Sequence, residues 1–388
     1  MKILVVHNSL MDSRSVSGVL KHYAGMAEEW IAAGHPTDFL VARAGFPQFQ
    51  SLCPRAGLVS SDNVFDATRY LAQTWRYFPA YGWRCASAHL IRLPRRYDLV
   101  YASGQFIVDI YGARVIARRL GAPWVAKIQH VLHSQPRRHG FINRLFLDSE
   151  KLAAKWMNRH AAQVMCLSGV VAEDYRKLEA SLGLKPTPTK VVGCGVDVRA
   201  LQAVPPEAKQ FDVVFLGRMH EQKGVFELPE VWRQVLAVKP DAKLVVIGEG
   251  PHRQEMEAMF RDLGIAGSVA CTGGIEEAAK NRLLAQSRVG LSLSYEEGWG
   301  LSVTEFLAMG LPVVAYDLPV FRHIFPGQLA GVNPGDRAAA ARELLGLLRD
   351  EPRRQSIGSQ GRDFARRYDY RHIAREELAV LEAALRRA

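Results

Sequence analysis

The stretch from Glu296 to Ala315 reads EEGWGLSVTEFLAMGLPVVA and decides the fold. It follows a short apolar run that is typical of a buried strand. Gly298 and Gly300 then allow a sharp turn and a close backbone approach to a ligand. The predicted order is strand (289–293), glycine turn, helix (301–309, stopping at Gly310) and strand (312–315). This order predicts one crossover of a parallel sheet.

Two carboxylates frame the start of the predicted helix. Glu297 precedes it, and Glu305 lies eight positions later, about two turns inside. The first amides of a helix have no partner within it, so those of Trp299, Gly300 and Leu301 face the turn. Carboxylates beside free amides suit the hydroxyls of a sugar. The alternative is an ordinary crossover whose carboxylates are only solvated.

The pattern also has a known counterpart. Glu, seven residues and Glu, with Gly-aromatic-Gly-Leu between them and Met-Gly-x-Pro-Val-Val after them, resembles the signature of retaining glycosyltransferases of family 4. The resemblance implies the α/β GT-B architecture. That architecture has two Rossmann-like, doubly wound parallel-sheet domains facing across a cleft, and a C-terminal helix that crosses back to the first domain.

Strand and helix patterns alternate along both halves of the chain, as in parallel sheets covered by helices. Strands are expected at 2–7, 37–42, 98–102, 124–129, 163–167, 212–216, 243–247, 268–271, 289–293 and 312–315. The region 45–96 is the least regular. We predict an acceptor-side domain (1–198), a linker containing Pro205-Pro206 (199–211), a donor domain (212–366) and a returning helix (367–388).

A basic loop follows the first strand of the second half. Gly217 allows the turn, and Arg218 and Lys223 place two cations before Gly224 and a helix. Arginine can hold a diphosphate through two parallel hydrogen bonds, and lysine adds a point charge. The loop resembles the Gly-Arg…Lys-Gly motif of the family, which implies that Arg218 and Lys223 hold the donor diphosphate, with Gly217 and Gly224 shaping the loop.

Two further turns are donor-binding candidates. Gly18 opens a helix after the first strand, a geometry that suits anions. The family usually has paired glycines near the donor phosphates there, whereas this chain has Ser17-Gly18, and Ser17 could instead cap the helix. The resemblance also implies that the nucleotide lies near Gly274 and Lys280. The alternative for Lys280 is an exposed side chain on a capping turn.

His130, at the end of the strand 124–129, is the candidate catalytic residue of the first half. In the family, a histidine at this strand end faces the cleft near the transferred sugar. Gln129 before it departs from the commonest family residue, and His133 and His139 are nearby rivals. The alternative is a histidine with an ordinary structural partner.

The net charge of +11 belongs to the first half of the chain. Residues 1–198 hold 25 Lys and Arg against 14 Asp and Glu, whereas residues 199–388 hold 25 of each. A basic half predicts an anionic partner. The expected partners are a nucleotide-sugar donor, a lipid-linked, polysaccharide or other anionic acceptor, and an anionic membrane touched by the basic half. The cationic and apolar segment 135–147 is a candidate for that membrane contact.

The remaining composition predicts a cytoplasmic protein, with peripheral contact at the inner face of the cytoplasmic membrane. No apolar run approaches the ~20 residues of a spanning helix, and the first residues lack a signal-peptide pattern. Five scattered cysteines argue against a disulfide framework or a zinc site. No metal or other cofactor is expected, because the basic pair can replace a metal and no Asp-x-Asp lies near the donor motifs.

The predicted function is retaining transfer of a sugar from a UDP- or GDP-sugar to an acceptor hydroxyl, in cell-surface polysaccharide, lipopolysaccharide or glycolipid synthesis. Arg218, Lys223, Glu297 and His130 would take part in catalysis, and Glu305 would hold the ribose. Two alternatives stay open. One is another GT-B enzyme, an epimerase or a phosphorylase, and the other is a non-catalytic protein that binds nucleic acid through its basic half. The spread of the cations lacks a recognition-helix or stacking pattern and disfavours nucleic acid.

Overall fold

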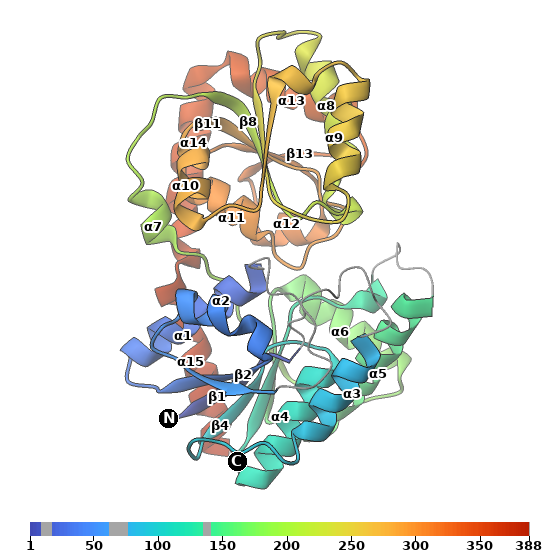
Figure 1. Cartoon of the computed structure of the whole chain (residues 1–388), viewed down its shortest axis with the longest axis vertical. Helices are drawn as coiled ribbons and strands as arrows, with labels where there is room; N and C mark the ends of the chain where they lie inside the picture. The colour runs from blue at the N-terminus through green and yellow to red at the C-terminus, as the bar shows by residue number, and fades with distance from the viewer. Residues whose placement is uncertain (9–17, 62–76, 135–140, 388) are drawn as a thin grey trace. The chain divides into compact units, whose positions relative to one another are not determined.

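The computed structural model describes residues 1–8, 18–61, 77–134 and 141–387. The chain divides into two compact units. Unit 1 contains residues 1–195 and 370–388, and unit 2 contains residues 196–369 (Figure 1). Each unit is built on a parallel sheet. The expectation of two Rossmann-like α/β domains is therefore confirmed.

Unit 1 has a seven-stranded sheet in the order β3-β2-β1-β4-β5-β6-β7. Its strands are β1 (Ile3–Val6), β2 (Thr37–Val41), β3 (Gly57–Ser60), β4 (Leu99–Ala102), β5 (Trp124–Ile128), β6 (Gln163–Cys166) and β7 (Thr189–Val191). Its helices are α1 (Gly18–Ala32), α2 (Phe46–Leu52), α3 (Tyr77–Ser87), α4 (Ile107–Leu120), α5 (Phe141–His160), α6 (Gly169–Ser181) and α15 (Tyr370–Arg387).

Unit 2 has a six-stranded sheet in the order β10-β9-β8-β11-β12-β13. Its strands are β8 (Phe211–Leu216), β9 (Leu244–Ile247), β10 (Val269–Gly273), β11 (Ser287–Ser292), β12 (Val313–Tyr316) and β13 (Leu329–Val332). Its helices are α7 (Val198–Gln202), α8 (Leu228–Leu236), α9 (Arg253–Asp262), α10 (Glu277–Ala285), α11 (Leu301–Ala308), α12 (Pro319–Ile324), α13 (Arg337–Arg349) and α14 (Glu351–Ala365).

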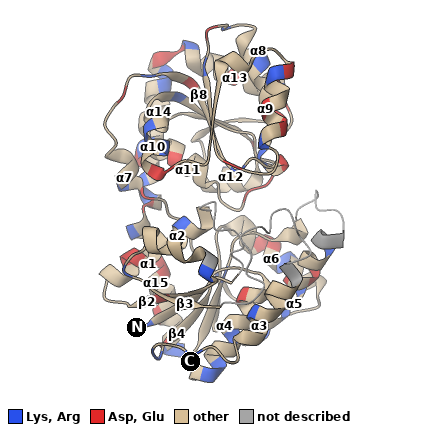
Figure 2. Ribbon diagram, in the orientation of Figure 1, with Lys and Arg blue, Asp and Glu red and all other residues tan. Residues whose placement is uncertain are grey.

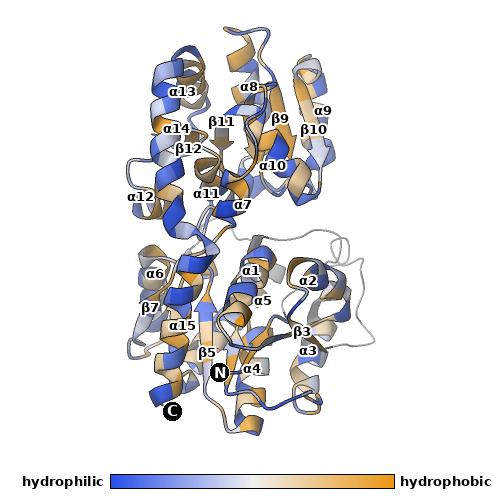
Figure 3. Cartoon of the chain, turned by 90° about the vertical axis from the view of Figure 1, so that its left-hand side faces the viewer, coloured by the Kyte–Doolittle hydropathy of each residue, from blue (hydrophilic) through white to orange (hydrophobic). Residues whose placement is uncertain are grey.

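The extent of burial explains which strands could be predicted from the sequence. Central strands such as β1, β4 and β9 are continuous apolar runs, because helices cover both faces of a parallel sheet (Figure 3). The edge strands β3, β7 and β13 were not predicted. They have three or four residues each and are only partly buried, and β3 and β7 include polar residues, whereas β13 is a short apolar segment that contains a glycine.

The irregular region 45–96 contains α2, β3 and α3 in its described parts. The boundary between the units also differs from the expected linker at 199–211. The chain passes from unit 1 to unit 2 after Gly195, and the expected linker contains α7, which packs on α11. Within the described residues, no helix is both long and apolar enough to span a bilayer. The five cysteines form no disulfide.

The C-terminal helix α15 belongs to unit 1 and packs along α1. The ring of its first residue, Tyr370, lies against Gly25 of α1, where a Cβ atom would overlap the ring. Gly195, the last residue before unit 2, also faces Tyr370, and a Cβ there would lie 2.8 Å from Tyr370 Cδ1. Two glycines thus let the start of α15 sit close to both segments.

A buried ion pair ties α15 to the sheet of unit 1. Lys127 of β5 donates to Glu377 of α15 at 3.0 Å, and both side chains have no exposed surface. The Lys127 ammonium also donates to the carbonyl of Gly193 at 3.1 Å and lies 3.1 Å from His22 Nε2. Tyr101 donates its hydroxyl to Glu377. Because these groups satisfy one another, the charges are tolerated in the core.

Removal of the lysine should therefore destabilise unit 1. Lys127→Met leaves the Glu377 carboxylate buried without its cation, which typically costs about 3–5 kcal/mol. Chemical denaturation would measure the loss. Lys151→Met, which removes an exposed cation on α5, should cost less than about 1 kcal/mol. The double variant Lys127→Met/Glu377→Gln should recover much of the stability, and equal costs for the two single variants would contradict the role of this pair.

Candidate functional site

The candidate site lies where the strand order of unit 2 reverses. After β8 the chain moves outward to β9 and β10, then returns to place β11 on the other side of β8. Loops at the carboxyl ends of such neighbouring strands diverge and leave room for a ligand. The loops here are residues 217–224 after β8 and residues 293–300 after β11, next to α11 in Figure 1.

The β8 loop ends against the start of the β11 loop. Gly224 has φ +70°, and a Cβ atom there would overlap the carbonyl oxygen of Leu293. Glycine is therefore required at 224 both by the backbone angle and by the close approach. Gly217 has no such constraint, because its nearest neighbour would be the Lys223 side chain at 3.8 Å. Arg218, between them, is exposed on the same loop.

An ion pair joins the two loops. Lys223 donates from Nζ to Glu297 Oε1 at 2.5 Å, and the same oxygen accepts from the Ser294 hydroxyl at 2.9 Å. Beside it, Gln222 Nε2 donates to Glu296 at 3.0 Å. The structure thus brings together Lys223 and Glu297, which the sequence analysis took from separate motifs, and adds Ser294 and Gln222, which it missed.

The glycine turn and α11 have the expected arrangement. Gly300 has φ +106°, and a Cβ there would lie 2.6 Å from the Phe321 ring, so no other residue fits easily. The first helical bond runs from the Thr304 amide to the Gly300 carbonyl at 3.0 Å. The amides of Leu301, Ser302 and Val303 therefore precede the helix's own hydrogen bonds, which leaves them for an anion or hydroxyl.

The second glutamate of the motif has a lysine partner of its own. Lys280 of α10 donates to Glu305 of α11 at 2.6 Å and also to Glu277. Burial alone would lower the pKa of Lys280, but the two carboxylates outweigh burial and raise it above its usual value. Lys280 is therefore a buried cation rather than an exposed capping residue. Gly274, at the turn before α10, is exposed.

The Trp299 side chain has a structural role that the motif did not reveal. It is 6% exposed, and its Nε1 donates to the Thr304 hydroxyl at 3.2 Å. Its ring lies 5.0 Å from that of Tyr368 and nearly perpendicular to it. Phe325 also contacts both rings. Trp299 belongs to the glycine turn, so the packing of its ring in this aromatic cluster helps to fix the conformation of the turn.

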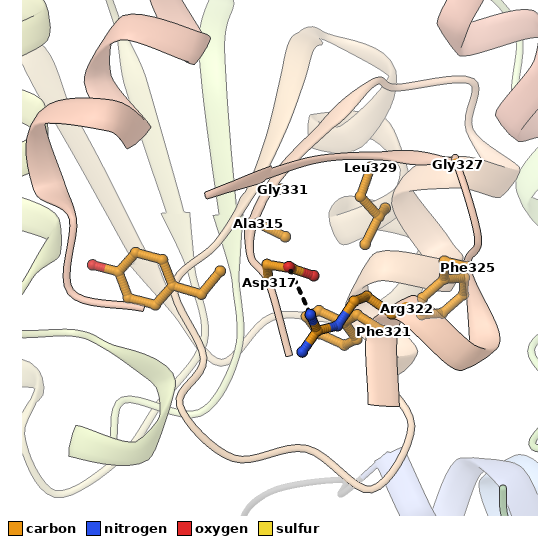
Figure 4. A pocket seen from close by; sticks show the side chains of 9 residues that line it. Ala315, Asp317, Phe321, Arg322, Phe325, Gly327, Leu329 and Gly331 are labelled. Atoms are coloured by element: carbon orange, nitrogen blue, oxygen red, sulfur yellow. Dashed lines mark ion pairs between the residues drawn. The ribbon is translucent and has the colours of Figure 1, made fainter. Parts of the chain in front are cut away.

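A small hollow of about 80 Å³, lined in part by Phe325 of that cluster, lies beside β12 and β13. Figure 4 shows Phe321 and Phe325 on its wall and Asp317 facing Arg322, at 3.5 Å. Its volume is well below the several hundred Å³ of a typical ligand site. It is too small for a nucleotide sugar. Among the described residues, no group of His, Cys, Asp and Glu is arranged to hold a metal ion.

Two further candidate site residues, Gly18 and His130, lie in unit 1. Gly18 is the first residue of α1, and Ser17 before it lies outside the described residues. His130 is half-buried two residues after β5. Of its rivals, His133 is held by Glu150, with Nδ1 and Oε2 2.7 Å apart, and His139 lies outside the described residues.

Polar side chains that the sequence analysis missed gather where the strand order of unit 1 reverses, after β1 and β4. Ser103 donates to the Val6 carbonyl at 3.0 Å, so its oxygen accepts from His7 Nδ1 at 2.6 Å. Gln129 Nε2 donates to the Tyr23 hydroxyl and to the Ser103 carbonyl. No spacing in the sequence marks these residues, because they come from four separate elements.

Two family models match this chain over adjoining ranges. "Glycosyltransferase Family 4" matches residues 16–200, and "Glycosyl transferases group 1" matches residues 199–364. A crystal structure of Anabaena HepE in complex with UDP and glucose has the same fold, with a TM-score of 0.76 at 19% identity over 99% of this chain and 100% of that one. The fold is therefore the GT-B fold of two parallel-sheet units. The chain belongs to glycosyltransferase family 4, as its motifs indicated.

Two curated relatives are also similar. The chain is 30% identical over 196 residues to the phosphatidyl-myo-inositol mannosyltransferase of Mycobacterium leprae, covering 48% of this chain and 52% of that protein. It is 25% identical over 291 residues to sulfoquinovosyl transferase SQD2 of Arabidopsis thaliana, covering 71% and 54%. The chain thus spans about half the length of these relatives.

Because His7 is buried, we expect the folded protein to lose stability in acid. Burial, together with the positive charge of Arg84, lowers its pKa from 6.5 to about 4. The unfolded chain then binds a proton more tightly than the folded one, so stability falls as the pH drops from about 6.5 to about 4 and levels off below that. The loss from His7 alone amounts to about 3 kcal/mol at most.

The His7→Asn variant isolates this contribution, because Asn keeps a donor for Ser103 but does not titrate. Urea unfolding near pH 7 and near pH 4.5 would measure it. The wild type should lose more stability than the variant between these two values. Part of the slope should remain in the variant, because burial and Lys127 also lower the pKa of His22. Equal slopes in the two proteins would exclude His7 as a contributor.

Proposed function

We propose that this protein transfers a sugar from a nucleotide-diphosphate sugar to an acceptor hydroxyl with retention of anomeric configuration. One observation carries the proposal: both glutamates of the motif are paired with lysines, Glu297 with Lys223 across the reversal point of the unit 2 sheet and Glu305 with Lys280 between α11 and α10. A cation and a carboxylate within one hydrogen bond of each other can hold a phosphate and a sugar hydroxyl side by side.

The proposed roles follow from this arrangement. Glu305 binds the ribose hydroxyls of the nucleotide, while Glu297 and the amides of Trp299, Gly300 and Leu301 hold the sugar. Gly18 and Gly274 approach the donor through backbone. Arg218 and Lys223 neutralise the departing diphosphate, whose charge grows in the transition state. Because Glu297 already orients Lys223, little reorganisation is needed at the moment of reaction.

The bond between sugar and phosphate oxygen breaks toward an oxocarbenium-like state in this proposal. The acceptor hydroxyl attacks from the side of the leaving group, and the leaving phosphate oxygen takes its proton. No protein nucleophile is needed, and the two cations replace a metal. His130 of unit 1 acts near the transferred sugar. UDP- and GDP-sugars are the proposed donors, and the name of the Anabaena HepE complex with UDP and glucose supports the former.

The proposed acceptor is lipid-linked or otherwise anionic, met at the inner face of the cytoplasmic membrane. The basic first half supports this, as does the relative named for a phosphatidyl-myo-inositol substrate. Cell-surface polysaccharide, lipopolysaccharide or glycolipid assembly is the setting that fits. An epimerase would form product without an acceptor and a phosphorylase would require phosphate, so product analysis with and without each distinguishes these alternatives.

Removal of either cation of the β8 loop should slow the reaction. Arg218→Ala or Lys223→Ala should each lower kcat by about 10²-fold, because each removes a partner of the transition-state charge. Arg261→Ala, an exposed arginine on α9, is the matched control and should keep the wild-type rate. Steady-state kinetics with the identified donor would measure this. Wild-type rates in both loop variants would remove the basic pair from the mechanism.

The donor and the role of Glu305 can be tested together. A thermal-shift screen with UDP, GDP, ADP and their common sugars identifies the nucleotide, because a ligand of the folded state raises the melting temperature. Glu305→Gln should then weaken binding of that nucleotide by about 10-fold or more, as expected for loss of hydrogen bonds to a charged group. Glu277→Gln removes the other carboxylate of Lys280 and should bind normally. An unaltered dissociation constant in Glu305→Gln would take Glu305 off the nucleotide.

A further inference from the structure

The excess positive charge of the chain is concentrated in one segment of unit 1. Residues 77–160, which contain α3, α4 and α5, hold 14 Lys and Arg against four Asp and Glu, whereas the rest of the chain holds 36 against 35. Two of the four acids, Asp109 and Glu150, are buried, and so are two of the cations, Arg84 of α3 and Lys127 of β5. Arg137 and Arg138 lie outside the described residues, so ten cations and two acids of this segment are at least partly exposed in the described part, on α4, on α5 and on the turn between α3 and β4. The basic residues can be followed as blue segments on α4 and α5 in Figure 2. The surface of this segment is therefore strongly cationic.

The three helices form one layer over the sheet of unit 1. Helix α4 packs against α3 on one side and against α5 on the other, and the three can be followed in Figure 1. Aromatic and cationic contacts link α4 and α5: the rings of Tyr111 on α4 and Trp156 on α5 are 5.0 Å apart, and Arg114 lies over Trp156 at 5.2 Å. Residues exposed on this layer face away from the sheet.

Large apolar side chains are exposed among these cations. Leu90 is 82% exposed, Trp83 45% and Leu152 43%. They are three of the six large hydrophobic residues that are exposed in the described part of the chain. Trp83 lies on α3, Leu90 lies three residues after the end of α3, and Leu152 lies on α5. A cationic layer that also presents apolar side chains differs from an ordinary solvated surface.

The turn that presents Leu90 is held in place by α4. The Arg119 guanidinium donates to the carbonyls of Ala88 at 2.7 Å and Ile91 at 2.9 Å, on either side of Leu90. His89 Nε2 also lies 2.8 Å from the Tyr111 hydroxyl. The most exposed leucine of the layer therefore projects from a fixed turn.

A basic hollow opens at the end of the same layer. Its volume is about 320 Å³, and it is lined by Arg114, Ala117, Arg118, Ala122, Trp124 and His160. No acidic residue lines it. Burial lowers the pKa of His160, and the positive charges of Arg114 and Arg159 lower it further. The hollow is thus a region of positive potential that can accept a phosphate group.

We infer that the outer face of α3, α4 and α5 docks on an anionic phospholipid bilayer. Leu90, Trp83 and Leu152 enter the boundary between headgroups and acyl chains, and the surrounding cations contact lipid phosphates. Nucleic acid would also attract the cations, but it offers no apolar phase for an exposed leucine. This face differs from the segment 135–147 expected from sequence, of which residues 135–140 lie outside the described residues.

Vesicle co-sedimentation of the full chain tests this face. Vesicles of phosphatidylcholine alone are compared with vesicles containing about 30% phosphatidylglycerol, without donor or acceptor, so failure here is separate from failure of the proposed transfer reaction. The wild type should bind the anionic vesicles at least about tenfold more tightly, and added salt should weaken binding.

Two variants of the face are compared with two matched controls in unit 2. Leu90→Ser should weaken vesicle binding about tenfold through loss of buried apolar area, and Arg118→Gln/Lys155→Gln should weaken it about fivefold per cation. The controls Leu263→Ser, at a residue 38% exposed, and Arg261→Gln should bind as the wild type. All four should keep the wild-type melting temperature, because the changed side chains are exposed.

Three results would overturn the inference. They are equal binding to both kinds of vesicle, equal losses in the face variants and the unit 2 controls, or displacement of the protein from anionic vesicles by a short DNA duplex at lower concentration than the lipid. The last result would assign the face to nucleic acid instead.

Discussion

The ion pair between Lys223 and Glu297 is the constraint on which the candidate site depends. It joins the loops that follow β8 and β11, two neighbouring strands whose connections leave in opposite directions. Without a contact across this point, each loop would be held only by its own strand and helix. The backbones of the two loops also meet, because Gly224 lies close to the carbonyl group of Leu293. Together they set the space between a cationic loop and the start of α11.

Further contacts hold the residues of the motif in place. Lys280 fixes Glu305 from α10, and the ring of Trp299 packs on Tyr368, which lies two residues before the chain returns to unit 1. In the proposed site, therefore, several residues of the motif hold its two glutamates and its glycine turn rather than a ligand. This explains why the motif contains a tryptophan whose side chain is almost entirely buried.

The sheet of unit 1 reverses its strand order in the same way as that of unit 2, but its ionic and polar side chains are distributed differently. Its core contains an ion pair, Lys127 with Glu377, that ties the last helix to the sheet. Neutral polar side chains, including His7 and Gln129, gather at the reversal point of its strands. Its excess of positive charge lies instead on α4, on α5 and on the turn between α3 and β4.

Much of the architecture could be predicted because local patterns report it. Apolar runs of four to six residues marked the central strands, and glycines before helical spacing marked the crossovers. The edge strands β3 and β7 were missed because they are short, partly exposed and include polar residues, and β13 was missed because it is a four-residue segment interrupted by a glycine. The motif also indicated the family, which the matching models confirm.

The sequence by itself determined the two-sheet α/β class, the family and the unequal distribution of charge between the halves, since each depends on composition or on spacing within one segment. Only the tertiary structure decided that Lys223 pairs with Glu297, that Lys280 is buried between two carboxylates, and that Leu90 projects from a fixed turn among cations. These contacts join residues that are far apart in the chain or that meet only after helices pack, and no local pattern encodes such distances.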